Sequence, residues 1–156
     1  MTNWRPPQRL RVLAVGLPFR GEGAGRELLA SPVRDDQGAL IGWRPIGGEV
    51  EFGETAEAAL QREFLEEFAL RIRPGAQICA LENLFEHHGA PGHEIILALQ
   101  AQLDPPETAA QDLFEPVEAG HEPASWTKLA RFLSGDAVLF PPGLLENLGG
   151  GLQLNK

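Results

Sequence analysis

Residues 54–70 constrain the fold more than any other part of the sequence, because they form the strongest predicted helix in the chain. Thr55 suits the N-cap position, and Glu57 in the first turn complements the positive end of the helix dipole. A helix turns by about 100° per residue, so apolar side chains spaced by four positions share one face. That face must be buried, and it contains Ala56, Leu60, Phe64 and Phe68.

Three carboxylates form a second stripe on this helix, directly beside the apolar one. Glu63 and Glu67 are four residues apart, so they lie one above the other, and Glu66 is their neighbour. Like charges at this spacing repel by a few tenths of a kcal/mol, and more where the core lowers the dielectric constant. Arg62 can reach Glu66 but cannot neutralise three acids. Carboxylates on adjacent turns suit Mg²⁺ or Mn²⁺, and the alternative interpretation is a solvated acidic face.

The remaining sequence predicts more strands than helices. Alternating or continuous apolar runs indicate strands, and glycine- or proline-containing stretches separate them. A long acidic segment, residues 104–122, is predicted to be mostly loop. We expect an α+β fold, a mixed sheet with helices packed on it, in one domain spanning residues 1–156. Its ordered core covers about residues 9–148, between a flexible N-terminal arm and a C-terminal tail. The predicted strands are 9–17, 27–33, 43–50, 76–85, 93–103 and 123–127, and the short helices are 128–133 and 142–148.

Charge and cysteine content narrow the possible partners. The formal net charge is −9, which disfavours binding to nucleic acids and to anionic membranes, since both are polyanions. Cys79 is the single cysteine, so an internal disulfide is excluded and a reducing compartment is favoured. The sequence has no apolar run long enough to span a bilayer. We therefore expect a cytoplasmic protein with a small-molecule substrate.

A longer pattern surrounds the acidic helix. Gly48 is followed after five residues by Glu54, and after seven more by Arg62-Glu63, Phe64, one spacer and Glu66-Glu67. The stretch GEVEFGETAEAALQREFLEEFAL, residues 48–70, strongly resembles the Nudix box of the Nudix hydrolases. The resemblance implies a Nudix-like α/β/α sandwich with the box on a strand-loop-helix. Ala69 replaces the family's usual glycine, from which we expect a slightly longer helix.

The resemblance also implies an activity. Nudix hydrolases use water and a divalent metal to cleave the diphosphate linkage of a nucleoside diphosphate joined to another group. The implied cofactor is Mg²⁺ or Mn²⁺, and the implied substrate is a small nucleotide. The implied metal ligands are the side chains of Glu63 and Glu67, a contribution from Glu66 directly or through water, and the carbonyl of Gly47.

Two further box residues are expected to orient these ligands. Arg62 is predicted to hold Glu66 or Glu54 by a charge-assisted hydrogen bond. The catalytic set implied by the resemblance is therefore Glu54, Arg62, Glu63 and Glu66. The general base is Glu63 or Glu66, unless it lies on a loop outside the box, where the candidates are Glu94, Glu115 and Glu118.

Residues outside the box suggest where substrate binds. Trp43 and Arg44 precede the box, where they can meet a base and a phosphate; alternatively Trp43 is core and Arg44 solvated. Phe85 can stack on a base, although a strand phenylalanine is commonly core. We interpret His87, His88 and His93 as surface or substrate-contacting residues rather than zinc ligands.

Other functions remain open to different degrees. A non-catalytic nucleotide-binding or sensing domain is the main alternative, supported only by Ala69. Isomerisation of a prenyl diphosphate is disfavoured because Cys79 lies downstream of the box, and messenger RNA decapping is disfavoured by the acidic balance. The particular substrate stays open, because fold alone does not set function, and a homodimer is possible.

Overall fold

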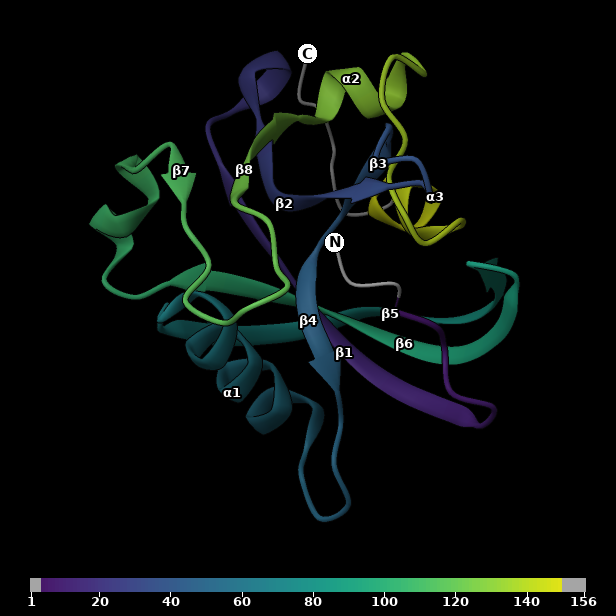
Figure 1. The fold of residues 1–156 in the computed structure, drawn as a ribbon. Coiled ribbons are helices and arrows are strands. Elements are labelled where there is room, and N and C mark those ends of the chain that lie inside the picture. Colours follow the sequence, from purple (N-terminus) through teal and green to yellow (C-terminus); the bar gives the residue numbers. More distant parts are fainter. Residues whose placement is uncertain (1–3, 150–156) are drawn as a thin grey trace.

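The computed structural model of this chain describes residues 4–149 (Figure 1). The predicted flexible tail beyond residue 148 therefore lies, except for Gly149, outside the described residues, as do residues 1–3 of the predicted arm. Strands outnumber helices, which confirms the predicted α+β class. The strands are β1 (Leu10–Arg20), β2 (Glu27–Arg34), β3 (Leu40–Arg44), β4 (Ile46–Glu49), β5 (Ile72–His87), β6 (Ala90–Leu103), β7 (Leu113–Phe114) and β8 (Ala124–Lys128). The helices are α1 (Ala56–Phe68), α2 (Leu129–Leu133) and α3 (Leu144–Leu148), with short 3₁₀ turns at Gly23–Gly25 and Pro106–Ala110.

The sheet is mixed, and β1 is its organising strand. The strand order is β5-β6-β1-β2-β8-β7, with β4 pairing to β1 and β3 to β2. β1 runs parallel to β6 from the pair Leu10–His93 to the pair Pro18–Ala101, and antiparallel to β4. The first half of the box is therefore attached to the centre of the sheet through β4.

The β5–β6 hairpin is longer than its sequence predicts. We expected a loop at residues 89–92, but the turn is confined to His88 and Gly89, both of which have positive φ angles. Pro91 lies within β6 opposite Glu86. Two consecutive left-handed residues reverse the chain in the sense that matches strand twist, so no longer loop is needed.

Helix α1 covers one face of the sheet, and α2 and α3 lie on the other side (Figure 1). Thr55 caps α1 as predicted, because its Oγ1 accepts a hydrogen bond from the Ala58 N–H at 3.1 Å. The predicted apolar stripe is buried: Leu60, Phe64 and Phe68 join a core that includes Ala14, Ile46 and Leu99. Gly16 permits close packing, since a Cβ there would lie 3.0 Å from the Phe64 ring.

The expectation of a longer box helix is wrong. α1 ends at Phe68, and Ala69 adopts a left-handed conformation with φ 53° and ψ 32°. The Ala69 N–H donates to the Leu65 carbonyl, which is the hydrogen bond of the αL capping motif, and the Leu70 N–H donates to the Phe64 carbonyl. Leu70 is buried in the core, so burying it requires the chain to turn out of the helix at Ala69.

The left-handed alanine makes a stability prediction. Ala69→Gly is expected to raise the free energy of unfolding by about 0.5–1 kcal/mol, because glycine adopts this conformation without the Cβ penalty. Urea denaturation of both proteins measures the difference. Ala58→Gly, on the exposed face of the same helix, is the control and should lower stability by about the same amount. A destabilised Ala69→Gly protein would contradict the assigned backbone conformation.

Candidate active site

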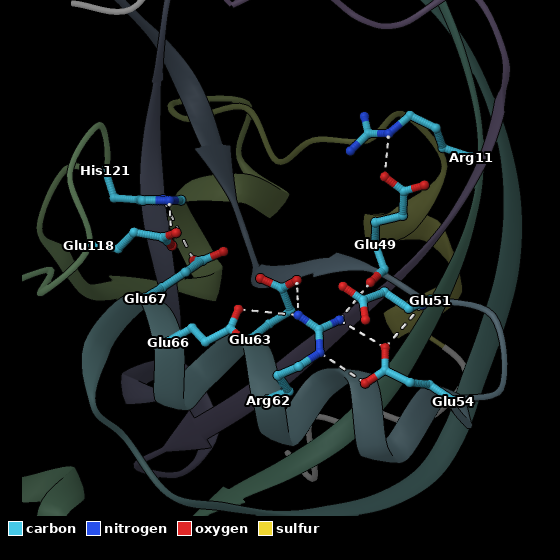
Figure 2. A network of polar contacts seen from close by, with 10 residues as sticks. All are labelled: Arg11, Glu49, Glu51, Glu54, Arg62, Glu63, Glu66, Glu67, Glu118 and His121. Carbon is cyan, nitrogen blue, oxygen red and sulfur yellow. Dashed lines mark hydrogen bonds and ion pairs between the residues drawn. The ribbon is translucent and has the colours of Figure 1, made fainter.

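Arg62 organises the acidic side chains of the box (Figure 2). Its Nε and Nη2 donate to the two carboxylate oxygens of Glu54 at 2.9 and 2.8 Å, a bidentate pair. Nη2 also donates to the backbone carbonyl of Glu49 at 2.9 Å. Nη1 donates to Glu63 at 2.9 Å and to Glu66 at 3.2 Å. Both predicted hydrogen bonds of Arg62 are therefore present, and one guanidinium ties the loop to the helix.

Glu54 is the fixed anchor of this network. The hydrogen bond from Arg62, assisted by one from the backbone N–H of Glu51, lowers the pKa of Glu54 to about 2. A carboxylate with so low a pKa is a poor proton acceptor at neutral pH. Its geometry suits a positioning role, in which it holds Arg62 in place.

Two consecutive glycines bring the box strand close to its neighbours. A Cβ at Gly47 would collide with the carbonyl oxygen of Ala14 on β1. A Cβ at Gly48 would occupy the space of the Glu63 carboxylate. Glycine is therefore required at Gly47, where a Cβ would meet backbone atoms, whereas at Gly48 the missing Cβ leaves space for the Glu63 carboxylate. The role of the Gly47 carbonyl as a metal ligand stays a prediction.

Glu67 is the most constrained acid of the site. Its side chain is only 10% exposed, and Glu63 lies one turn earlier on the same face of α1. Burial, followed by the hydrogen bond with and repulsion from Glu63, raises the pKa of Glu67 to about 8, and the charge of Arg44 opposes this rise. Two stacked acids, one of them buried, provide hard oxygen ligands with an unmet need for positive charge. This donor set fits a divalent metal ion.

The loop between β7 and β8 adds two residues to the acidic cluster. The backbone N–H groups of Val117 and Glu118 donate to the Glu67 carbonyl at 2.8 and 3.4 Å. His121 then lies with Nδ1 3.7 Å from a Glu67 oxygen and Nε2 3.2 Å from a Glu118 oxygen (Figure 2). Of the three candidates for the base outside the box, Glu118 is therefore the one brought into the Glu67 group; Glu115 and Glu118 are both exposed, and Glu94 lies in β6 rather than on a loop.

His121 is the residue that sequence reasoning missed. It lies in a segment predicted to be loop, 54 positions after Glu67, and no spacing pattern connects the two. His87, His88 and His93 do not form a metal-binding group within the described residues. His88 instead contacts Asp36 at 2.6 Å, and His93 lies 3.7 Å from Glu82.

A second polar group lies on β1 and β6. Arg11 donates to Glu94 at 2.9 Å and to Glu49 at 3.3 Å, and burial raises the pKa of Glu94. Glu94, another candidate base, is thus paired with an arginine. The indole of Trp4 lies 5.4 Å from the Arg11 guanidinium and 5.8 Å from the His87 ring. Part of the predicted loose arm therefore packs on this group.

The three predicted substrate contacts differ in their surroundings. Trp43 is half-buried against the core, and its backbone N–H donates to the Val138 carbonyl. Phe85 packs on Gly92 so closely that a Cβ there would overlap its ring. Arg44 is exposed, and its charge acts on both Glu67 and His87. All three roles stay predictions, and Arg44 has the most suitable position.

Comparison with known proteins agrees with the fold and the motif. The NUDIX domain matches residues 10–148. The structure of Escherichia coli ORF135 protein is similar, with a TM-score of 0.62, 20% identity, and coverage of 91% of this chain and 90% of that one. The structure of a MutT NUDIX hydrolase from Burkholderia pseudomallei has a TM-score of 0.58 and 22% sequence identity, and the match covers 79% of this chain and 86% of that one. The structure of a Caenorhabditis elegans Ap4A hydrolase, determined as a binary complex, has a TM-score of 0.54 and 18% sequence identity. The match covers 90% of this chain and 96% of that one.

The chain therefore belongs to the NUDIX domain family. It is a Nudix-type hydrolase, and the class acts on pyrophosphate linkages. Among residues 4–149, no helix has the length and apolar character needed to cross a membrane.

The raised pKa of Glu67 predicts how stability depends on pH. An acid whose pKa is higher in the folded than in the unfolded state favours folding below its unfolded pKa, and this contribution is lost as pH rises through the folded pKa. Metal-free protein should lose stability between about pH 4.5 and 8 for this reason. Glu67→Gln should remove this loss and be more stable at pH 8 by about 1–3 kcal/mol.

Chemical denaturation in chelator at pH 5, 6.5 and 8 measures this effect. Glu57→Gln, an exposed acid in the first turn of the same helix, is the matched control and should keep the wild-type pH dependence. Parallel pH profiles for wild type and Glu67→Gln would show that Glu67 is not held neutral in the folded protein.

Proposed function

We propose that this protein hydrolyses the diphosphate linkage of a nucleoside diphosphate derivative, with water as the nucleophile and Mg²⁺ or Mn²⁺ as cofactor. The observation that carries the proposal is the stacked pair of Glu63 and Glu67. Arg62 contacts Glu63, whereas Glu67 is buried and has no ion pair with Arg62 among the described residues. Such a pair is unfavourable for the fold by itself, and a bound cation would make it favourable. Its place in the Nudix box supports the same conclusion.

The metal would be held by the oxygens of Glu63, Glu66 and Glu67, together with the Gly47 carbonyl. A divalent ion held by these residues would supply positive charge against the diphosphate and against the negative charge that develops on its oxygens. Arg62 serves this site as a positioning residue, because it fixes Glu63 and Glu66 through one rigid guanidinium.

Proton removal from the attacking water falls to one of the carboxylates at the metal site. Glu63 and Glu66 are the candidates within the box. Glu66 is 51% exposed and contacts Arg62 at 3.2 Å, so it is both accessible to water and held in place. Glu94 is less suited because its carboxylate is bound by Arg11.

The substrate is proposed to extend from the acidic helix towards the aromatic side chains. Arg44 supplies the positive charge for a phosphate in an otherwise acidic protein, and Trp43 and Phe85 are the proposed base contacts. One of the similar structures is an Ap4A hydrolase, and dinucleoside polyphosphates are therefore one substrate class to test. A cytoplasmic location and a homodimer stay predictions.

Turnover by wild type and Glu67→Gln tests the proposal. Product release is measured from a panel of sugar nucleotides, ADP-ribose, dinucleoside polyphosphates and oxidised nucleotides, with Mg²⁺, Mn²⁺ or chelator. We expect metal-dependent cleavage whose kcat falls about 10²–10³-fold in Glu67→Gln. This substitution removes the charge of a ligand but keeps the shape of the side chain. Glu57→Gln should keep wild-type activity. Tight nucleotide binding without turnover across the panel would favour a sensing domain.

Arg44 makes a separate prediction about substrate binding. Arg44→Gln removes the charge that acts on Glu67 and His87, so KM should rise about tenfold while kcat changes by less than about threefold. Steady-state kinetics on the substrate found in the panel measures both constants. Arg71→Gln, also exposed, is the control. If kcat instead fell about tenfold while KM stayed unchanged, Arg44 would act in the transition state only.

A further inference from the structure

Glu67, Glu118 and His121 form a group that extends outside the box. Each offers one ligand atom, and the three atoms lie within 4.8 Å of one another. Glu67 comes from α1, whereas Glu118 and His121 come from the β7–β8 loop, which begins about 45 residues after the box ends. Figure 2 shows the two loop side chains directed at Glu67. The group therefore exists only because the loop folds back onto the helix.

Hydrogen bonds fix this loop on both sides of His121. Before it, the N–H groups of Val117 and Glu118 donate to the carbonyl of Glu67. After it, the Glu122 carboxylate accepts a 2.7 Å hydrogen bond from Arg34 on β2. The imidazole is thus held beside the metal-binding helix by contacts that do not involve the imidazole itself. Preorganised ligands of this kind are typical of a built binding site.

Among the described residues, the acids of this group form no ion pair with a lysine or arginine, although the charge of Arg44 acts on Glu67. Within residues 4–149, the ion pairs of Glu67 and Glu118 are both with His121, at 3.7 and 3.2 Å. The distance of 3.7 Å from Nδ1 to Glu67 is too long for a hydrogen bond. The Glu67 side chain is nine-tenths buried, so its carboxylate is directed into the group with Glu63 and His121 rather than into water.

We propose that His121 is a direct metal ligand, forming with Glu67 and Glu118 a mixed nitrogen–oxygen site that prefers a first-row transition metal ion to Mg²⁺. This inference rests on the proposed function in one respect, the role of Glu67 as a ligand. Imidazole nitrogen suits transition metals, whereas Mg²⁺ is bound almost entirely by oxygen. His121 therefore decides which metal the enzyme selects, and the box alone does not.

Binding of Mn²⁺ by itself tests the inference without any turnover. Pulsed electron paramagnetic resonance of the Mn²⁺-loaded protein reports directly on a nitrogen ligand through its coupling to ¹⁴N. We expect this coupling in wild type, its loss in His121→Gln and its retention in His93→Gln, a matched control at a half-exposed histidine that contacts Glu82. Absence of ¹⁴N coupling in wild type would overturn the inference.

Calorimetric titration with Mn²⁺ and with Mg²⁺ provides a second measurement. His121→Gln should weaken Mn²⁺ binding by about 10–100-fold and Mg²⁺ binding by less than about threefold. Equal weakening of both ions would show that the imidazole positions the loop and is not a selective ligand. Glu118→Gln should weaken both ions, because a carboxylate serves either. Circular dichroism verifies that each variant is folded.

The outcome is separable from that of the proposed function. If Glu67→Gln keeps full hydrolytic activity while wild type shows ¹⁴N coupling, the proposed function fails and the His121 site stands. If Glu67→Gln abolishes hydrolysis while wild type shows no coupling, the proposed function stands and the His121 site fails.

Discussion

The structure of this site depends on the contacts of one guanidinium, that of Arg62. Its nitrogens bind Glu54 and the Glu49 carbonyl on the loop side, and Glu63 and Glu66 on the helix side. A lysine has a single point of charge and could not make these contacts in one plane. The loop entering α1 and the acids on its surface are thereby held in a fixed relation.

The same arrangement explains why Glu67 differs from its neighbours. Arg62 compensates Glu63 and Glu66, but Glu67 projects on the far side of Glu63, towards the core and the β7–β8 loop. Glu66 stays half-exposed, whereas Glu67 is nine-tenths buried. Desolvation therefore acts most strongly on the one acid that the arginine does not reach, which concentrates the need for a cation at a single position.

Local patterns predicted the parts of the fold that are determined locally. The stripe of Leu60 and Phe64, the Thr55 cap and the reach of Arg62 all follow from helix geometry within about two turns, and the structure confirms them. The helix end was wrong, because the burial of Leu70 outweighs the cost of a left-handed alanine.

Local patterns could not predict the second polar group, made by Arg11 and Glu94, or the position of His121 beside Glu67. Arg11 and Glu94 meet because two strands pair in parallel across 83 positions. His121 reaches Glu67 through loop backbone hydrogen bonds that carry no side-chain signature. The missing information in both cases is long-range pairing, which periodicity in a single sequence does not contain.

The parallel pairing of β1 with β6 also has a kinetic consequence. The hydrogen bonds of α1 and its entry loop join residues that are close in sequence. The contact between Arg11 and Glu94 instead requires closure of a chain segment of about eighty residues. Loop-closure entropy rises with the length of the segment, and non-local contacts slow folding. The contact between Arg11 and Glu94 therefore costs more loop-closure entropy than the contacts of Arg62 within α1 and its entry loop. During synthesis, the site is completed only after the β7–β8 loop, which carries Glu118 and His121, has emerged.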